Sequence, residues 1–143
     1  LIKLKIFISS DHAGFGLKNY IFEDLKKKNY KIDNLGPFND KSVDYPIYAK
    51  KLANKVSKNK TNFGILVCGS GTGMAMAANK VKNIRAAVCY NMKNTKLSRL
   101  HNNANIITVG SRLTSKNLAF KLVNIFLKTK FEGGRHLRRI KKI

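Results

Sequence analysis

Short apolar segments alternate with longer amphipathic segments along the whole chain. In short segments such as 3–9 and 63–67, apolar residues fall on both alternating sets of positions, which is typical of strands buried on both faces of a parallel sheet. In longer segments such as 49–56, apolar residues recur at i, i+3, i+4 and i+7, the spacing of one helix face. The pattern predicts strands at 3–9, 30–35, 63–67, 86–89 and 106–109, and helices at 17–25, 49–56, 74–81, 94–101 and 118–126.

Five strands separated by helices define the expected fold class. Parallel strands need crossover connections, and the helices in those connections cover both faces of the sheet. We therefore predict a three-layer α/β/α sandwich with a five-stranded, all-parallel, Rossmann-like sheet. The 143 residues suffice for one such unit and leave no room for a second, so we expect a single domain over 1–143 with a basic tail at 135–143.

The composition suggests an alternative function and an expected cellular location. A net charge of +22 is compatible with a basic nucleic-acid-binding α/β domain, because each neutralised phosphate adds free energy from counterion release. The lysines, however, are spread along every predicted helix and do not form one stripe with interleaved aromatic residues, which argues against nucleic acid as a partner. Lysines interrupt the first residues, where a signal peptide would be apolar, and no segment has the roughly 18 apolar residues of a membrane span. Two cysteines are too few for a disulfide framework in a chain of this size. We therefore expect a cytoplasmic protein with no membrane partner.

The polar residues at the carboxyl ends of the predicted strands are the candidates for chemistry. In an open parallel sheet, ligands bind beyond these ends, where helix N-termini and loops converge. The candidates are the segments 11–12, 68–73, 90–91 and 110–112. Between Asp44 and Glu132 the chain has no acidic residue, so a catalytic base in this long stretch must be another type of side chain.

The segment 68–73, Cys-Gly-Ser-Gly-Thr-Gly, is the richest of these candidates. A strand that enters a glycine-rich turn and then a helix presents several backbone N–H groups to an anion. The segment is not a dinucleotide fingerprint, because Met74 stands in place of the third glycine, and it is not a Walker A loop. A tight turn without a ligand is the alternative. Cys68, placed at the start of a helix, is expected to have a useful thiolate fraction and to act as a base, whereas Cys89 is interpreted as a buried core residue inside a strand.

Other polar candidates each have a structural alternative. Asp11 and His12 are suited to contacts with substrate hydroxyls or phosphate, or to an Asx turn that caps the next helix. His101 is predicted at a helix C-terminus, where a protonated imidazole is stabilised and where a single histidine is more often a simple cap. The arginines of 135–139 are suited to bidentate phosphate binding, or form a solvated basic terminus.

Seven collinear motifs together resemble the ribose-5-phosphate isomerase B family, which also contains galactose-6-phosphate and allose-6-phosphate isomerases. They are 10–14, 44–46, 68–73, 77–80, 97–102, 110–112 and 132–136, and they cover nearly the whole chain. The resemblance implies an aldose-ketose isomerase that interconverts ribose 5-phosphate and ribulose 5-phosphate through a cis-enediolate, without metal or organic cofactor. It further implies a homodimer or tetramer with sites at the subunit interface.

The resemblance also implies roles for particular residues. Cys68 would accept the proton, His101 would open the ring, Asp11 would lie near the ring oxygen, and Ser70 would help move a proton between two oxygens. Phosphate would be held by His12, Arg135 and Arg139. The rest of the substrate pocket would comprise Tyr45, Gly69, Gly71, Thr72, Gly73, Asn102 and Arg112. Branches of the family that lack the cysteine use a glutamate where this chain has Met74. Leu137-Arg138 departs from the tail motif, which leaves open whether Arg138 or Arg139 contacts phosphate.

Overall fold

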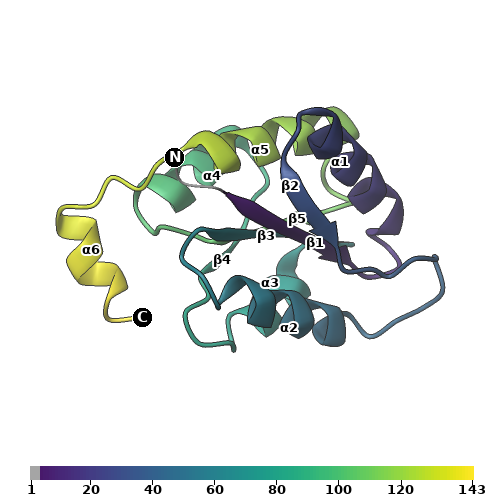
Figure 1. Ribbon diagram of the computed structural model, residues 1–143, viewed down its shortest axis with the longest axis horizontal. Coiled ribbons are helices and arrows are strands. Elements are labelled where there is room, and N and C mark those ends of the chain that lie inside the picture. The colour runs from purple at the N-terminus through teal and green to yellow at the C-terminus, as the bar shows by residue number, and fades with distance from the viewer. Residues whose placement is uncertain (1–3) are drawn as a thin grey trace.

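The alternating segments fold into five strands and six helices over residues 4–143, which are the residues that this computed structural model describes (Figure 1). Lys3, where the first strand was expected to begin, lies outside the described residues. The strands are β1 (Lys5–Ser10), β2 (Lys31–Asn34), β3 (Asn62–Cys68), β4 (Ala86–Val88) and β5 (Ile106–Gly110). The helices are α1 (Phe15–Lys27), α2 (Tyr45–Val56), α3 (Thr72–Ala78), α4 (Met92–Leu100), α5 (Lys116–Lys128) and α6 (Arg135–Ile140).

All strands pair in parallel in one sheet with the order β2-β1-β3-β5-β4. From β1 the chain moves first to β2 on one side and then to β3 on the other, so the strand order reverses between β1 and β3. A crevice for ligands is expected outside the carboxyl ends of the strands at such a reversal. β5 lies between β3 and β4, which leaves β4 at the edge of the sheet.

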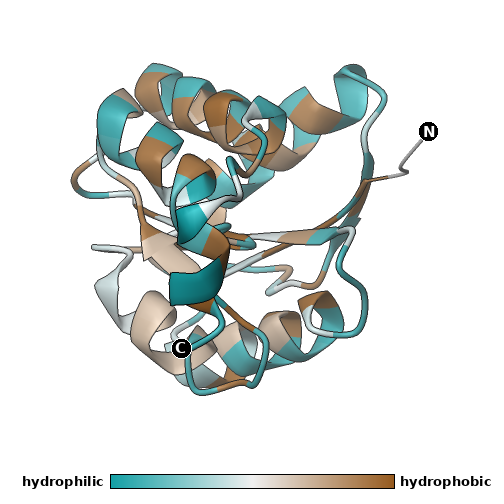
Figure 2. Cartoon of the chain, turned by 90° about the vertical axis from the view of Figure 1, so that its left-hand side faces the viewer, coloured by the Kyte–Doolittle hydropathy of each residue, from teal (hydrophilic) through white to brown (hydrophobic). Residues whose placement is uncertain are grey.

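Helices cover both faces of the sheet (Figures 1 and 2). Helices α2 and α3 pack on one face, and α1 and α5 pack on the other with α4 beside α5. The predicted three-layer α/β/α fold class is thus confirmed. The central strands explain why both faces are needed: Ile6 and Ile8 of β1 point toward the α1 and α5 layer, while Phe7 points toward α2 and α3. Burying each such isoleucine side chain stabilises the fold by roughly 1.5–3 kcal/mol.

The ends of several elements differ from the expected ones. Helix α3 begins at Thr72 and ends at Ala78, because the first turn is formed by the glycine-rich segment and not by the apolar stripe that starts at Met74. Cys89 lies one residue beyond β4, not inside it as predicted, yet it is buried and its N–H donates to the carbonyl of Thr108 at 2.9 Å. The basic tail contains helix α6, which projects from the rest of the fold (Figure 1). Among residues 4–143, no helix combines the length and the apolar character needed to cross a bilayer.

Candidate active site

A pocket of about 420 Å³ lies beyond the carboxyl ends of β1, β3 and β5. Its position follows from the strand order, because Asp11 directly follows β1, Cys68 ends β3, and Arg112 follows β5. Backbone bonds hold these ends together: the N–H of Asp11 donates to Val67 O at 3.1 Å, and that of Arg112 donates to Gly69 O at 3.0 Å. The pocket is lined by Asp11, Tyr45, Cys68, Gly69, Ser70, Gly73, Arg112 and Leu113.

The thiol of Cys68 lies at the base of the glycine-rich turn, with the residue 5% exposed. The N–H of Gly71 donates to its Sγ atom at 3.0 Å, a contact that stabilises a thiolate. Gly71 has φ +80°, a conformation that side chains other than glycine rarely adopt, so the turn that places this N–H depends on glycine.

The turn has fewer free N–H groups than the sequence suggested. We expected the groups of 69–73 to be available to an anion, but Gly71 donates to Cys68 and Thr72 donates to Ser70 Oγ at 3.3 Å. Within residues 4–143, the N–H groups of Gly69, Ser70 and Gly73 have no partner. These three donors remain for a ligand, because a short turn must also satisfy its own side chains.

The two carboxylate oxygens of Asp11 have different surroundings. Its Oδ1 atom accepts a hydrogen bond from the N–H of Gly14 at 2.9 Å, which is the Asx turn considered as the structural alternative. The carboxylate nevertheless lines the pocket, and its Oδ2 atom has no partner among residues 4–143. The turn therefore orients the carboxylate and leaves it able to accept a hydrogen bond from a ligand.

Tyr45 closes the pocket from the side of α2. As the first residue of that helix, it lays its ring on Gly73, where an added Cβ would lie only 2.6 Å from the ring atom Cε1. Gly73 is thus required for the close approach of the ring. His12 lies outside the pocket lining on an exposed turn, where its Nδ1 accepts from the N–H of Val43 at 3.2 Å. This bond leaves the Nε2 atom of His12 available to solvent or a ligand.

A buried lysine supports the loop that carries Val43 and Tyr45. Lys18 of α1 is fully buried, and its ammonium donates to Pro37 O at 2.5 Å and to Asn34 Oδ1 at 3.1 Å. Its charge also lies 5.1 Å from the ring centre of Phe15. Burial lowers the pKa of Lys18 from 10.5 to about 8, because the charged form loses its hydration. The sequence contained no signal for this role, since lysines occur on every helix that the sequence predicts.

This lowered pKa predicts a pH dependence of stability. Below about pH 8 Lys18 is protonated in both the folded and unfolded chain, while between about 8 and 10.5 the unfolded chain binds more protons. The contribution of Lys18 to the free energy of unfolding should therefore rise with pH across this window. Urea titrations of the wild type and Lys18→Met should give a stability difference that changes from pH 8 to 10.5. Lys26→Met, an exposed change on the same helix, is the control for loss of a lysine side chain from α1. A constant difference for Lys18→Met would contradict the shifted pKa.

The remaining predicted site residues form a second group. His101, Asn102 and Arg139 line a separate hollow of about 300 Å³ together with His136, and Arg135 begins the adjacent helix α6. Helix α4 starts at the carboxyl edge of the sheet and runs back, so His101, the cap of its C-terminus as predicted, lies near the amino edge. Cys68 ends β3, whose seven residues span about 20 Å. Within one chain, the structure therefore does not bring the two groups together.

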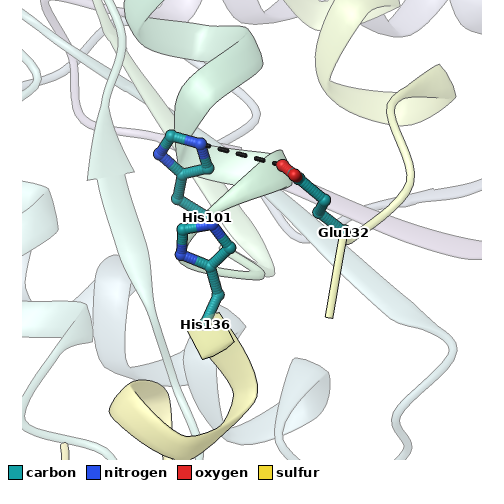
Figure 3. Close-up of side chains that lie close together, drawn as sticks. All are labelled: His101, Glu132 and His136. Atoms are coloured by element: carbon teal, nitrogen blue, oxygen red, sulfur yellow. Dashed lines mark ion pairs between the residues drawn. The ribbon is translucent and has the colours of Figure 1, made fainter. Parts of the chain in front are cut away.

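The second hollow contains an interaction that sequence reasoning did not assign. The imidazoles of His101 and His136 are stacked, with ring centres 4.3 Å apart, and His101 Nε2 lies 3.8 Å from Glu132 Oε2 (Figure 3). The pKa of His136 is lowered, first by desolvation and then by the positive charges of His101 and Arg135. The motif 132–136 contains Glu132 and His136, but their contact with His101 depends on the path of the chain.

Arg99 fixes the position of the second group. It is buried, and its guanidinium donates to the carbonyls of Thr129 at 3.0 Å and Ala104 at 2.6 Å while it stacks over the ring of Phe63. Burial lowers its pKa to about 10. These contacts join the C-terminal end of α4 to the end of α5. Arg99 therefore fixes the position of His101 relative to Glu132, which lies in the segment between α5 and α6.

The segment 90–91 was also a candidate, and the structure places it elsewhere. Asn91 caps helix α4: its side chain accepts from the N–H of Asn94, and the Asn94 side chain accepts in return from the N–H of Asn91. Neither Tyr90 nor Asn91 lines the pocket around Cys68. The reason is the strand order, since β5 separates β4 from β3.

Comparison with known proteins identifies the family of this chain. The sequence model of the ribose/galactose isomerase family matches residues 6–143. The chain belongs to this family. It is 39% identical to the ribose-5-phosphate isomerase B of Escherichia coli over 139 residues, which cover 97% of this chain and 93% of the relative. The resemblance inferred from the seven motifs is confirmed, and the chain is an isomerase.

Solved structures of the family have the same fold. The ribose 5-phosphate isomerase of Thermotoga maritima gives a TM-score of 0.94 at 47% identity, covering 97% of this chain and 96% of that chain. Ribose-5-phosphate isomerase B of Mycoplasma genitalium, solved with bound ribulose-5-phosphate, gives 0.95 at 46% identity, covering 99% and 95%. These two family members thus share the overall fold of this chain.

Proposed function

We propose that the protein interconverts ribose 5-phosphate and ribulose 5-phosphate. The observation that carries this proposal is the position of the Cys68 thiol. It accepts a hydrogen bond from the N–H of Gly71 and lines a pocket where the strand order reverses. Support comes from the family and from its member of M. genitalium, which was solved with ribulose-5-phosphate. The sequence alternatives of galactose 6-phosphate and allose 6-phosphate belong to the same class of reaction.

The proposed chemistry is a proton transfer between neighbouring carbons of the open-chain sugar. The Cys68 thiolate removes the proton from C2 of the aldose, and the electron pair of the broken C–H bond forms the C1–C2 double bond of a cis-enediolate. Negative charge collects on the carbonyl oxygen, within reach of the free N–H groups of Gly69, Ser70 and Gly73. Donors fixed before the reaction stabilise such charge effectively. Return of the proton from the thiol to C1 gives the ketose.

Neighbouring polar groups complete the proton movements. Asp11, oriented by its bond to Gly14, would hold the ring oxygen or a hydroxyl through its free oxygen. Ser70 would pass a proton between the oxygens on C1 and C2. His101 would donate the proton that opens the furanose ring, since an imidazole can do so near neutral pH. All these groups belong to the chain itself, so the scheme uses no metal or organic cofactor.

Phosphate recognition is proposed at the residues of helix α6 together with His12. Arg135 and Arg139 are one helical turn apart and therefore lie on the same side of α6. Arg139 lines the hollow that contains His101, and Arg138 does not, which favours Arg139 as the phosphate ligand. Asn102, Arg112 and Tyr45 would complete the pocket around the sugar, with Thr72 and Gly71 shaping the turn.

The separation of the two groups leads us to propose a dimer in which each site uses two chains. The Cys68 pocket of one chain would face the His101 and Arg139 hollow of its partner. Leu113 lines the Cys68 pocket, and Ile47 and Met76 belong to α2 and α3, whose first turns contribute Tyr45 and Gly73 to it. These three apolar side chains are 64–71% exposed and would be covered by such contact. Association of two dimers into a tetramer is compatible with this arrangement.

Purified protein should isomerise ribose 5-phosphate with a higher kcat/KM than allose 6-phosphate or galactose 6-phosphate. A five-carbon substrate is expected because it is the sugar in the related complex. The measurement is a direct assay of ketose formation with each sugar, with Cys68→Ser as the blank. Turnover of a six-carbon sugar alone would make the substrate assignment wrong. Binding of nucleic acid at physiological salt without any turnover would instead favour the basic-domain alternative raised by the charge of +22.

A further inference from the structure

We propose that His101, Glu132 and His136 form a binding site for Zn²⁺. The three side chains come from different places in the fold: the C-terminus of α4, the link after α5, and the first turn of α6 (Figure 3). Each offers one ligand atom, and these atoms all lie within 4.8 Å of one another. Two imidazole nitrogens and one carboxylate oxygen are a typical protein ligand set for zinc.

The geometry can close around an ion with small side-chain movements. Zinc ligands lie about 2.0–2.2 Å from the metal, so two ligands of one tetrahedral ion are about 3.4 Å apart. The distance from His101 Nε2 to Glu132 Oε2, 3.8 Å, is already near this value. The side chains of Glu132 and His101 are 56% and 39% exposed, which leaves them room to move. Three protein ligands leave the fourth position open to water or an added ligand.

The backbone holds the three residues in place before any ion arrives. The N–H of Glu132 donates to Leu100 O at 3.1 Å, which fixes the link against the end of α4. The N–H of His136 donates to Gly133 O at 3.1 Å in the turn that begins α6. Glu132 supplies the carboxylate of the cluster, whose negative charge offsets part of the charge of a cation. Nearby arginines, including Arg139 in the same hollow, oppose cation binding and weaken it.

Zinc bound here would inhibit the isomerase. Coordination through Nε2 occupies that nitrogen of His101 and holds the ring against Glu132, so Nε2 can no longer carry a proton to the sugar ring. The ion would also occupy the hollow in which Arg139 is proposed to meet phosphate. The inhibitory part of this proposal rests on the proposed function of His101, whereas the binding part does not.

Binding is tested directly on protein freed of metal with a chelator. Zn²⁺ binding is measured by calorimetry, and Co²⁺ is added as a spectroscopic probe of coordination geometry. Glu132→Gln and His136→Gln should each weaken Zn²⁺ binding by more than the 10–100-fold that follows from loss of an outer-shell partner. The matched control is Glu23→Gln, which makes the same charge change on α1, away from the three residues. This variant should bind Zn²⁺ as the wild type does.

The outcomes are separable. Equal Zn²⁺ binding by wild type and the Glu132→Gln, His136→Gln double variant, with thermal melts showing both folded, would overturn the site. Loss of binding in Cys68→Ser, with a thiolate charge-transfer band in the Co²⁺ spectrum of the wild type, would assign the ion to Cys68 and also overturn it. Binding at the three residues without loss of activity would overturn only the inhibitory role. An enzyme without isomerase activity would refute the proposed function and leave the binding result intact.

Discussion

Replacing Cys68 by serine should lower kcat by about 10²–10⁴-fold, the range expected for loss of a positioned general base. The change keeps the size of the side chain and its hydrogen bond from Gly71, so folding and ligand binding should be largely unchanged. The hydroxyl is a far weaker base than a thiolate, and the chain has no acidic residue between Asp44 and Glu132 to replace it. The measurement is the steady-state rate together with exchange of the C2 proton for solvent deuterium.

Cys89→Ser is the matched control and should retain normal activity. Cys89 is buried beyond β4, and burial raises the pKa of its thiol, so it should react slowly with an alkylating reagent. Alkylation of the wild type should therefore inactivate the enzyme through Cys68, and a sugar phosphate should protect it. Near-normal exchange of the C2 proton by Cys68→Ser would show that another group is the base, even if the isomerase assignment were correct.

Mixing two inactive variants should restore about a quarter of the wild-type activity if each site uses two chains in a symmetric dimer. The variants are Cys68→Ser and His101→Asn, each expected to lose about 10²–10⁴-fold alone. After subunit exchange at equal concentrations, half of the dimers contain one chain of each kind. In such a dimer, one site combines both substitutions and the other site combines intact Cys68 with intact His101. The measurement is the activity of the mixture after exchange compared with the separate variants.

The control mixture combines Cys68→Ser with Asp11→Asn. Asp11 and Cys68 line the same pocket of one chain, so every site in this mixture carries one of the two substitutions. No activity should return. Recovery in neither mixture, with exchange of subunits verified by mass spectrometry, would refute the shared site. It would mean that helix α6 and His101 move to the Cys68 pocket of their own chain.

The sequence by itself determined the fold class and the edge of the sheet at which the Cys68 pocket lies. Hydrophobic spacing is a local property, so it indicated the strands and helices to within a few residues, and their alternation required a parallel sheet covered on both faces. The carboxyl ends of such strands share one edge, which placed Asp11, Cys68 and Arg112 on the same side. The seven motifs then indicated the family, which the comparisons confirmed.

The tertiary structure alone decided which of these residues meet. Strand order depends on pairing between distant segments, so the position of β5 beside β3 could not be derived from local patterns. Because β5 lies beside β3, Arg112 lines the pocket and Asn91, which follows β4, does not. The burial of individual charged side chains also depends on contacts between distant segments. Lys18 and Arg99 resemble the other basic residues in the sequence, and only packing shows that they are enclosed and support the two groups of site residues. The direction of α4 places His101 near the opposite edge of the sheet from Cys68, because a helix that connects parallel strands must run back along them.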